Sequence, residues 1–238
     1  MKILIIRHGE PDYSIDSLTS KGWDEASLLS DRLVKMEIDD FYCSPLGRAK
    51  DTAKATLDKY GKAAKILPWL REFPGQVTLP WQDKGRIPWD LPPNYWAKSP
   101  AFYEYESWLE HPLMQGGGMR ETFCEITSGI DALLNGYGYQ RDGYLYRCET
   151  DKEVTIALFC HFALGMTIVS YLSHISPIIL WHSFFMPASS VTTLVSERDR
   201  TGSTLFRCMQ VGDTSHLYAA GEPISPAGLY PDFDRTLQ

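Results

Sequence analysis

Cysteine is scarce in this sequence, and no two of its five cysteines form a CxxC pair. The absence of such a pair argues against a zinc ribbon and against a thioredoxin-like redox motif. Three of the five lie in apolar, strand-like runs, which is typical of buried free thiols. An odd number of cysteines fits a reducing compartment better than a disulfide scaffold, so we expect a cytoplasmic protein.

The sequence also lacks an excess of positive charge and long apolar runs. The net charge is −7, whereas proteins that bind nucleic acids or acidic membranes normally present a basic surface. No apolar run reaches the ~18–20 residues of a membrane helix, and the four apolar residues after Lys2 are too few for a signal-peptide core. We therefore expect neither a nucleic-acid partner nor a membrane partner. An anionic small molecule remains open as a substrate, because a few cations gathered in one cleft can outweigh the average charge.

The chain does have the length and composition of a sizeable globular domain, with 238 residues of which 44% are hydrophobic and 22% charged. Such a length can bury a substantial core without disulfides or metals. We expect residues 1–238 to form one domain with an insertion at about 76–151, where Trp, Tyr and Pro accumulate and the regular pattern is lost. A homodimer is compatible with the sequence.

Short apolar runs alternate with helical patterns along the rest of the chain. Strands are expected at 2–6, 41–43, 63–67, 154–160, 191–196 and 204–211, and helices at 23–36, 45–60, 101–109, 121–134 and 163–172. Ser44 and Pro45 suit the N-cap and the first position of the second helix. The alternation predicts an α/β fold: a three-layer sandwich with a mostly parallel central sheet, helices on both faces and a helical cap formed by the insertion.

Charged and titratable side chains follow three of the expected strands. Arg7 and His8 end the first strand, Arg48 lies one helical turn beyond the second, and His161 ends the fourth. Ligands of open α/β sheets bind at the carboxyl ends of the strands, so these residues converge on one crevice if the three strands are neighbours. Arginine can bind two phosphate oxygens at once, and a neutral imidazole can attack phosphorus. His161, if protonated, adds a further donor. The cluster therefore indicates phosphoryl transfer.

The order of these residues along the chain resembles that of one protein family. Arg7-His8-Gly9-Glu10 resembles the RHG signature of the histidine phosphatase superfamily, which includes the cofactor-dependent phosphoglycerate mutases. Residues 18–26 resemble the family's LTxxGxxQA segment, with Glu25 in place of the usual glutamine, and residues 44–53 resemble its SPLxRAxxTA segment. Cys160-His161 is similar to the family's second histidine, and residues 213–217 to a late segment common in the branch.

The resemblance implies roles for individual residues. It implies that His8 is the nucleophile and that Arg7, Arg48 and His161 form the phosphate pocket. It also implies a proton donor after the third strand, and Glu72 is the carboxyl group that we choose there. Such a donor must hold its proton near the working pH, and burial can raise a carboxyl pKa enough.

Phe162 departs from the family pattern. Glycine usually follows the second histidine, and in the acid phosphatase branch an aspartate proton donor stands there, so Phe162 argues against that branch. No metal or organic cofactor is expected. His111, His174 and His182 lack ligand-like spacing such as HExxH, and we interpret them as structural.

The sequence thus predicts a phosphomonoesterase that hydrolyses a small phosphate ester through a phosphohistidine intermediate, with His8, Glu72 and His161 as catalytic residues. A phosphoglycerate mutase-like phosphotransferase is the first alternative, because the same residues serve its first half-reaction. A non-catalytic phosphate-binding module is the second. The aromatic residues of the insertion either line a pocket for an apolar or aromatic leaving group or form a small core that docks the insertion. Lys84 and Arg86 either reach further phosphate groups or are solvated.

Overall fold

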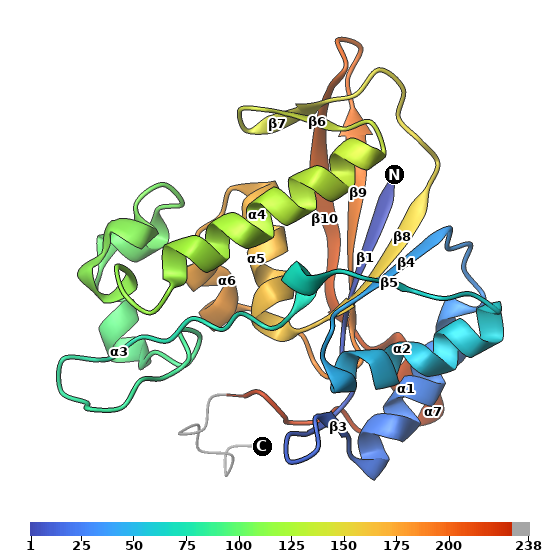
Figure 1. Cartoon of the computed structure of the whole chain (residues 1–238), viewed down its shortest axis with the longest axis horizontal. Coiled ribbons are helices and arrows are strands. Elements are labelled where there is room, and N and C mark those ends of the chain that lie inside the picture. Colours follow the sequence, from blue (N-terminus) through green and yellow to red (C-terminus); the bar gives the residue numbers. More distant parts are fainter. Residues whose placement is uncertain (230–238) are drawn as a thin grey trace.

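An eight-stranded mixed sheet runs through the protein (Figure 1), and the computed structural model describes residues 1–229. The strands follow the order β5-β4-β8-β1-β9-β10-β7-β6. Their bounds are β1 Lys2–Arg7, β4 Asp40–Cys43, β5 Lys65–Ile66, β6 Gln140–Asp142, β7 Leu145–Arg147, β8 Thr155–Cys160, β9 Val191–Arg198 and β10 Ser203–Asp213. Strands β5, β4, β8 and β1 pair in parallel, whereas the pairs from β1 to β6 by way of β9 are antiparallel. The α/β class is confirmed, with a sheet that is parallel in one half only.

Helices cover both faces of the sheet, as the sequence predicts. One face carries α1 (Ser20–Leu33) and α2 (Gly47–Tyr60), with α7 (Ser215–Ala220) against α1. The other face carries α4 (Met119–Gly136), α5 (Phe162–Ser173) and α6 (Pro177–Ser183) (Figure 1). Side chains of β1 alternate between the faces: Leu4 and Ile6 pack toward α1 and α2, and Ile3 and Ile5 pack toward α5. All four are completely buried, which explains why this strand is apolar throughout.

Two expected helix features are wrong. The helix expected at 101–109 is replaced by two 3₁₀ helices, Pro100–Tyr103 and Trp108–Glu110, because Phe102 and Trp108 must turn into the core and are 0% and 1% exposed. Ser44 does not cap α2, which begins at Gly47 after the N-cap Leu46. The Ser44 hydroxyl is engaged instead with a histidine of the site described below.

The aromatic interval 76–151 contributes to the main body as well as covering it. It begins with irregular chain that includes α3 (Pro93–Trp96) and 3₁₀ helices, one of them Pro112–Met114. Its second half supplies α4, which packs on α5, and the hairpin β6–β7, which extends the sheet beyond β10. Phe102 and Trp108 share one apolar cluster with residues of β1 and β8, so the core interpretation holds for these two side chains. The boundaries of the insertion stay a prediction.

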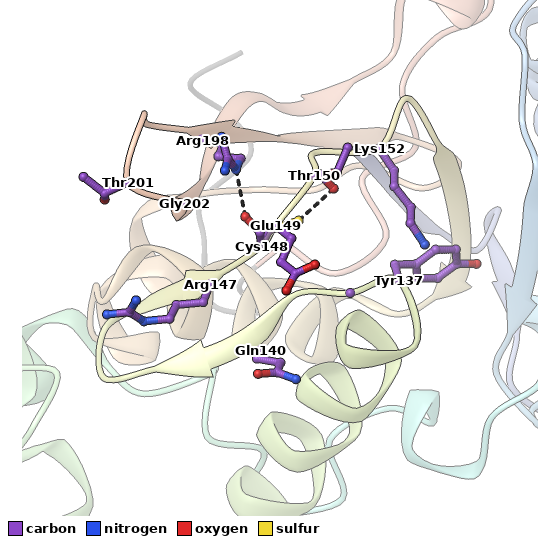
Figure 2. A pocket seen from close by; sticks show the side chains of 11 residues that line it. Tyr137, Gln140, Arg147, Cys148, Glu149, Thr150, Lys152, Arg198, Thr201 and Gly202 are labelled. Carbon is purple, nitrogen blue, oxygen red and sulfur yellow. Dashed lines mark hydrogen bonds between the residues drawn. The ribbon is translucent and has the colours of Figure 1, made fainter.

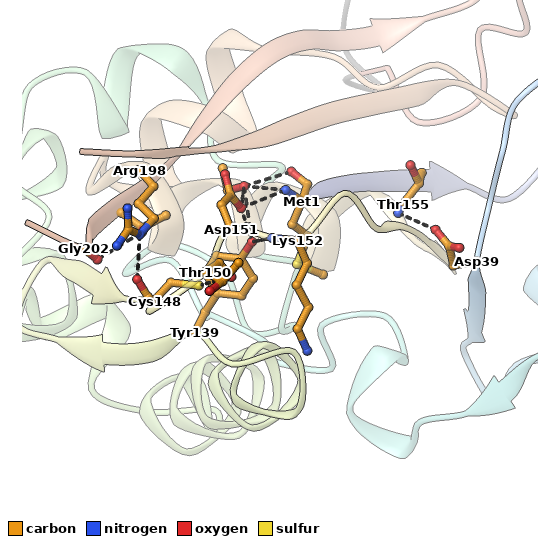
Figure 3. A network of polar contacts seen from close by, with 12 residues as sticks. Met1, Asp39, Tyr139, Cys148, Thr150, Asp151, Lys152, Thr155, Arg198 and Gly202 are labelled. Carbon is orange, nitrogen blue, oxygen red and sulfur yellow. Dashed lines mark hydrogen bonds and ion pairs between the residues drawn. The ribbon is translucent and has the colours of Figure 1, made fainter. Parts of the chain in front are cut away.

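A polar network closes the amino end of the parallel strands (Figure 3). The Met1 ammonium donates to Asp151 Oδ1 at 3.1 Å and to Ser196 Oγ at 2.5 Å, and the Tyr139 hydroxyl donates to the same Asp151 carboxylate. These contacts fasten the loop before β8 to β1 at the end opposite to the expected site. Within residues 1–229, none of the helices is long and apolar enough to cross a membrane. The cytoplasmic location stays a prediction.

Candidate active site

The carboxyl ends of β1 and β8 bring the two motif histidines together. Arg7 lies beside Cys160 in the parallel pairing, and the His8 backbone N–H donates to the Cys160 carbonyl at 3.0 Å. His8 and His161 directly follow these strand ends, and their ring centroids are 5.1 Å apart. The structure therefore places both histidines at one edge of the sheet, where the sequence predicts a crevice.

His8 is a neutral imidazole, and only one of its two ring nitrogens is hydrogen-bonded to the backbone. Its Nδ1 donates to the Gly9 carbonyl at 2.7 Å, so Nε2 carries the lone pair. Arg48 Nε lies 3.4 Å from that Nε2. Burial, with the positive charge of Arg7, lowers the pKa of His8 well below its usual value. A neutral imidazole that faces an arginine can act as a nucleophile toward a bound anion.

The backbone after His8 is pressed against α1. A side chain at Gly9 would place its Cβ 2.7 Å from the Gly22 carbonyl oxygen, so only glycine fits this approach. The Gly9 N–H donates to Thr52 Oγ1 at 2.9 Å, and the Glu10 N–H donates to Glu25 at 2.7 Å. These contacts fix the loop that carries the His8 imidazole and its carbonyl partner.

Glu25 is a supporting residue whose role the sequence did not reveal. Its side chain is 0% exposed, and its second carboxyl oxygen has no hydrogen-bond partner within residues 1–229. Burial raises the pKa of Glu25 to about 7. The sequence feature that could have indicated this role is the glutamate at a position where the family usually has glutamine.

Exchanging Glu25 for glutamine is expected to stabilise the protein at neutral and alkaline pH but not in acid. A carboxyl whose pKa is raised from 4.5 to about 7 makes the native state lose stability as pH rises through that interval. Glutamine resembles the protonated acid, so Glu25→Gln should match wild type at pH 4 and exceed it by about 2 kcal/mol at pH 8. Urea unfolding at both pH values measures this difference. The exposed Glu37→Gln serves as control, and a gain that does not change with pH would contradict the prediction.

Arg7 is buried beneath the end of the described chain. Its two Nη groups donate to the Met186 carbonyl at 2.6 Å and to the Ala227 carbonyl at 3.0 Å, while its Nε has no partner within residues 1–229. Gly228 packs directly on the guanidinium: its φ is +94°, and a Cβ there would lie 2.6 Å from Arg7 Nη2. Ser225 holds the same segment by donating to Glu10 at 2.5 Å. Arg7 can therefore offer its Nε and remaining Nη hydrogens to an oxyanion.

Arg48 is positioned by the loop between β2 (Pro11–Asp12) and β3 (Ser17–Leu18). Its Nη1 donates to Asp16 Oδ1 at 2.5 Å, and its guanidinium lies 5.4 Å from the centre of the Tyr13 ring. The second oxygen of Asp16 accepts the Gly47 N–H at 2.7 Å, which ties the loop to the start of α2. Nothing in the sequence pattern indicated that Asp16 and Tyr13 would orient this arginine.

His161 is a neutral imidazole whose orientation is set by Ser44. Burial and the neighbouring His8 lower the pKa of His161 well below its usual value. The ring is therefore neutral, and it can donate only through its single N–H. Ser44 Oγ lies 2.7 Å from His161 Nε2 and accepts the Leu46 N–H at 3.2 Å. When the Ser44 hydroxyl donates to Nε2, the imidazole proton lies on Nδ1. This Nδ1 is buried without a partner among residues 1–229 and can donate to a phosphate oxygen.

Removing the Ser44 hydroxyl is expected to lower kcat/KM about tenfold, because His161 then loses the group that selects its tautomer. Steady-state assays of Ser44→Ala against a phosphate monoester measure the loss. Ser30 is a matched control: it is also 0% exposed, and its hydroxyl bonds a backbone carbonyl within α1. Equal losses in Ser44→Ala and Ser30→Ala would show that the effect is structural.

Glu72 lies at the start of α5, beside the two histidines. Its Oε1 accepts the Phe73 N–H at 2.9 Å and the Leu164 N–H at 3.0 Å. Burial raises the pKa of Glu72 despite these hydrogen bonds and the nearby arginines. The carboxyl group therefore keeps a proton to higher pH than an ordinary glutamate.

These groups open into a cavity of about 430 Å³. Arg7, His8, Arg48 and Glu72 line it, and the His161 ring, 5.1 Å from that of His8, adjoins the lining. Lys84 and Arg86 do not belong to its lining. The four residues and the adjoining histidine form a cationic pocket with one proton-holding carboxyl group, which suits a phosphate monoester.

The late segment at 213–217, which resembles the family pattern, contacts the loop beneath the site through His216. His216 Nε2 lies 3.0 Å from Ser189 Oγ, and the Ser189 N–H donates to the His8 carbonyl at 3.1 Å, so His216 supports the loop beneath the site. No group of three or more His, Cys, Asp or Glu side chains within residues 1–229 could hold a metal ion.

A larger hollow of about 820 Å³ lies at the other end of the sheet, beside the β6–β7 hairpin (Figure 2). It contains none of the predicted site residues. Its Arg198 donates to the Cys148 carbonyl at 2.7 Å, and its Arg147 pairs with the exposed Asp142. The 430 Å³ cavity, which gathers Arg7, His8, Arg48 and Glu72, is therefore the candidate active site.

Known proteins with the same fold act on phosphate esters. Phosphoserine phosphatase from Entamoeba histolytica superposes with a TM-score of 0.59 at 20% identity, over 91% of this chain and 98% of that one. The mycobacterial glucosyl-3-phosphoglycerate phosphatase has a TM-score of 0.62 at 19% identity, over 90% and 99%. At such identities the likeness establishes the fold alone.

Sequence comparison gives the family. The chain is 37% identical over 73 residues to the 2,3-bisphosphoglycerate-dependent phosphoglycerate mutase of Thermoplasma acidophilum, over 26% of this chain and 36% of that protein. The chain thus matches about a third of the length of this curated relative. The sequence model of the histidine phosphatase superfamily (branch 1) matches residues 3–208. The chain belongs to the histidine phosphatase superfamily, branch 1.

Proposed function

We propose that the protein is a phosphomonoesterase that works through a phosphohistidine on His8. The observation that carries this proposal is the neutral His8 imidazole, whose Nε2 faces the Arg48 guanidinium at 3.4 Å in a cavity that also holds Arg7 and Glu72. Membership of the superfamily and the phosphatases among the structural neighbours support phosphoryl transfer. The substrate is a phosphorylated small molecule.

In the first step, His8 Nε2 forms a bond to phosphorus while the bond from phosphorus to the ester oxygen breaks. Glu72 transfers its proton to the departing oxygen, so the product leaves as a neutral alcohol. Arg7, Arg48 and the Nδ1–H of His161 bind the phosphoryl oxygens, whose charge is redistributed in the transition state. The Gly9 carbonyl, which accepts the His8 Nδ1–H at 2.7 Å, stabilises the phosphorylated ring.

In the second step, water attacks phosphorus on the phosphohistidine. The Glu72 carboxylate takes one proton from this water, the phosphorus–nitrogen bond breaks, and the electron pair returns to His8 Nε2. Inorganic phosphate leaves, and both His8 and Glu72 regain their starting protonation states.

A phosphoglycerate mutase-like transferase shares the first step, and the short match to a mutase keeps it as the second candidate. The lining of the cavity favours hydrolysis. Among residues 1–229, Arg7 and Arg48 are the only lysine or arginine side chains that line it, and both are needed for the transferred phosphoryl group. A phosphoglycerate carries a carboxylate as well, which finds no further cation there.

Rapid quenching with a ³²P-labelled monoester tests the proposal. We expect an acid-labile phosphoprotein to form within one turnover and to be absent from His8→Ala, with free phosphate as the product. An isomerised phosphoester as the product would indicate the mutase instead. Phosphate release by His8→Ala at the wild-type rate would overturn the mechanism.

A further inference from the structure

A second cavity of about 370 Å³ adjoins the candidate active site. The two cavities share part of their walls, because Trp89, Phe162 and the chain at Gly228 and Leu229 line both. The Arg7 guanidinium lies at this junction, 5.8 Å from the centre of the Phe162 ring and 5.7 Å from that of Phe185, which lines the second cavity. A molecule bound by the arginines can therefore extend into the second cavity.

Aromatic rings form a large part of the wall of the second cavity. Trp89, Trp96, Trp181, Phe162, Phe184 and Phe185 all contribute. Trp89 and Trp181 meet edge to face at 6.2 Å, and Phe184 keeps 44% of its surface exposed. Such rings offer flat apolar surfaces against which another ring can pack.

His182 belongs to this wall as an uncharged ring. Its Nδ1 donates to the Ile178 carbonyl at 2.7 Å, and its Nε2 accepts the Leu91 N–H at 3.2 Å. Burial lowers its pKa to about 4, so the ring is neutral near neutral pH. It stacks on Trp96 with ring centroids 5.0 Å apart. Both ring nitrogens are therefore occupied, and what His182 offers to a ligand is its ring surface.

Within residues 1–229 no positively charged side chain lines the second cavity itself, and the Arg7 guanidinium lies at its junction with the first cavity. Among these residues, the one side chain of fixed charge that lines the second cavity is the carboxylate of Asp90. A leaving alcohol that carries a carboxylate or a second phosphate would have to lose water there without gaining an ion pair. An alcohol with an apolar ring exchanges water for aromatic contacts instead.

We propose that the 370 Å³ cavity binds the leaving group of the ester, and that the substrates are monophosphates of alcohols that bear a flat apolar or aromatic group. The inference rests on the proposed function, since His8 and the arginines hold the phosphoryl end. Glu72 lines the first cavity together with Trp89 and Phe162 of the shared wall, so the cavity that holds the phosphoryl end also holds a proton donor for the ester oxygen. Phe162, in the position where the family usually has glycine, supplies part of the wall that both cavities share.

Binding to the inactive His8→Ala variant tests the cavity independently of turnover. Calorimetry compares 2-phenylethyl phosphate with ethyl phosphate, whose leaving alkoxides are alike, and with 3-phosphoglycerate. We expect 2-phenylethyl phosphate to bind about 10- to 100-fold more tightly than either, as burial of one phenyl ring predicts. Equal affinities for the three esters, or tightest binding of 3-phosphoglycerate, would overturn the inference.

Variants of the second cavity then connect binding with turnover. In the otherwise wild-type enzyme, Phe184→Ala and Trp96→Ala should each lower kcat/KM for 2-phenylethyl phosphate about three- to tenfold and leave ethyl phosphate unchanged. Tyr218→Ala removes an aromatic ring that is 89% exposed and outside both cavities, and should change neither. Hydrolysis of all esters without preference would contradict this inference and leave the proposed function intact. Preferential binding to His8→Ala without hydrolysis by wild type would instead overturn the proposed function.

Discussion

Replacement of His8 by alanine is expected to lower kcat/KM for any phosphate monoester by about four orders of magnitude or more. The variant removes the atom that forms the bond to phosphorus, and no other ring nitrogen is available to replace it. His161, the adjacent imidazole, is completely buried and has its Nε2 engaged by Ser44 at 2.7 Å. Initial-rate assays with purified wild type and His8→Ala measure the loss.

His174 offers a matched control for this substitution. It lies at the end of α5 with a φ of +55°, a conformation that asparagine tolerates. His174→Asn therefore removes an imidazole without straining the backbone and should keep wild-type activity. A His8→Ala enzyme that retained a tenth of the wild-type rate would exclude His8 as the nucleophile.

Glu72→Gln is expected to slow the cleavage of alkyl phosphates by about 10²- to 10⁴-fold, which is the usual contribution of a general acid. Glutamine preserves the two hydrogen bonds from the Phe73 and Leu164 N–H groups but cannot transfer a proton. An ester with a good leaving group, such as 4-nitrophenyl phosphate, needs no such proton. Its phosphohistidine should therefore form at nearly the wild-type rate, as a quench-flow burst can show.

The pH dependence provides a second measure of Glu72. Since burial raises the pKa of Glu72, its protonated form persists to higher pH than in an ordinary glutamate. The kcat/KM for alkyl esters should therefore fall as pH rises through that pKa. Because the pKa of His8 is lowered well below its usual value, the nucleophile stays neutral across the same range. The alkaline decline should be absent from Glu72→Gln.

Glu125→Gln is the control for the loss of a carboxylate near this segment. Glu125 pairs on the surface with Arg71, the residue next to Glu72, and exposed pairs contribute little to stability. This variant should keep both the rate and the pH profile of wild type. If Glu72→Gln slowed 4-nitrophenyl phosphate as much as alkyl phosphates, the role of Glu72 would be electrostatic or structural.

The sequence alone determined the features that depend on local pattern and strand direction. Apolar runs at the positions of β1, β4 and β8 predicted strands, and side chains directly after parallel strands must emerge at one edge of the sheet. The placement of His8 and His161 side by side follows from that rule, and so does the position of Arg48 in the first turn after β4. The motifs added the family, which the comparison confirms.

Tertiary structure decided which groups orient these side chains. Asp16, Ser44 and Glu25 act on residues that are 32, 117 and 15 positions away along the chain, and the Ala227 carbonyl reaches Arg7 across 220. No local periodicity encodes such contacts, because they depend on how loops from separate elements meet after the sheet has formed. The helix expected at 101–109 failed for the same reason: burial of Phe102 and Trp108 outweighed a helical pattern whose energetic preference is small. Likewise, the aromatic residues of the insertion became partly core and partly cavity wall, a division that only the packing of the folded chain could make.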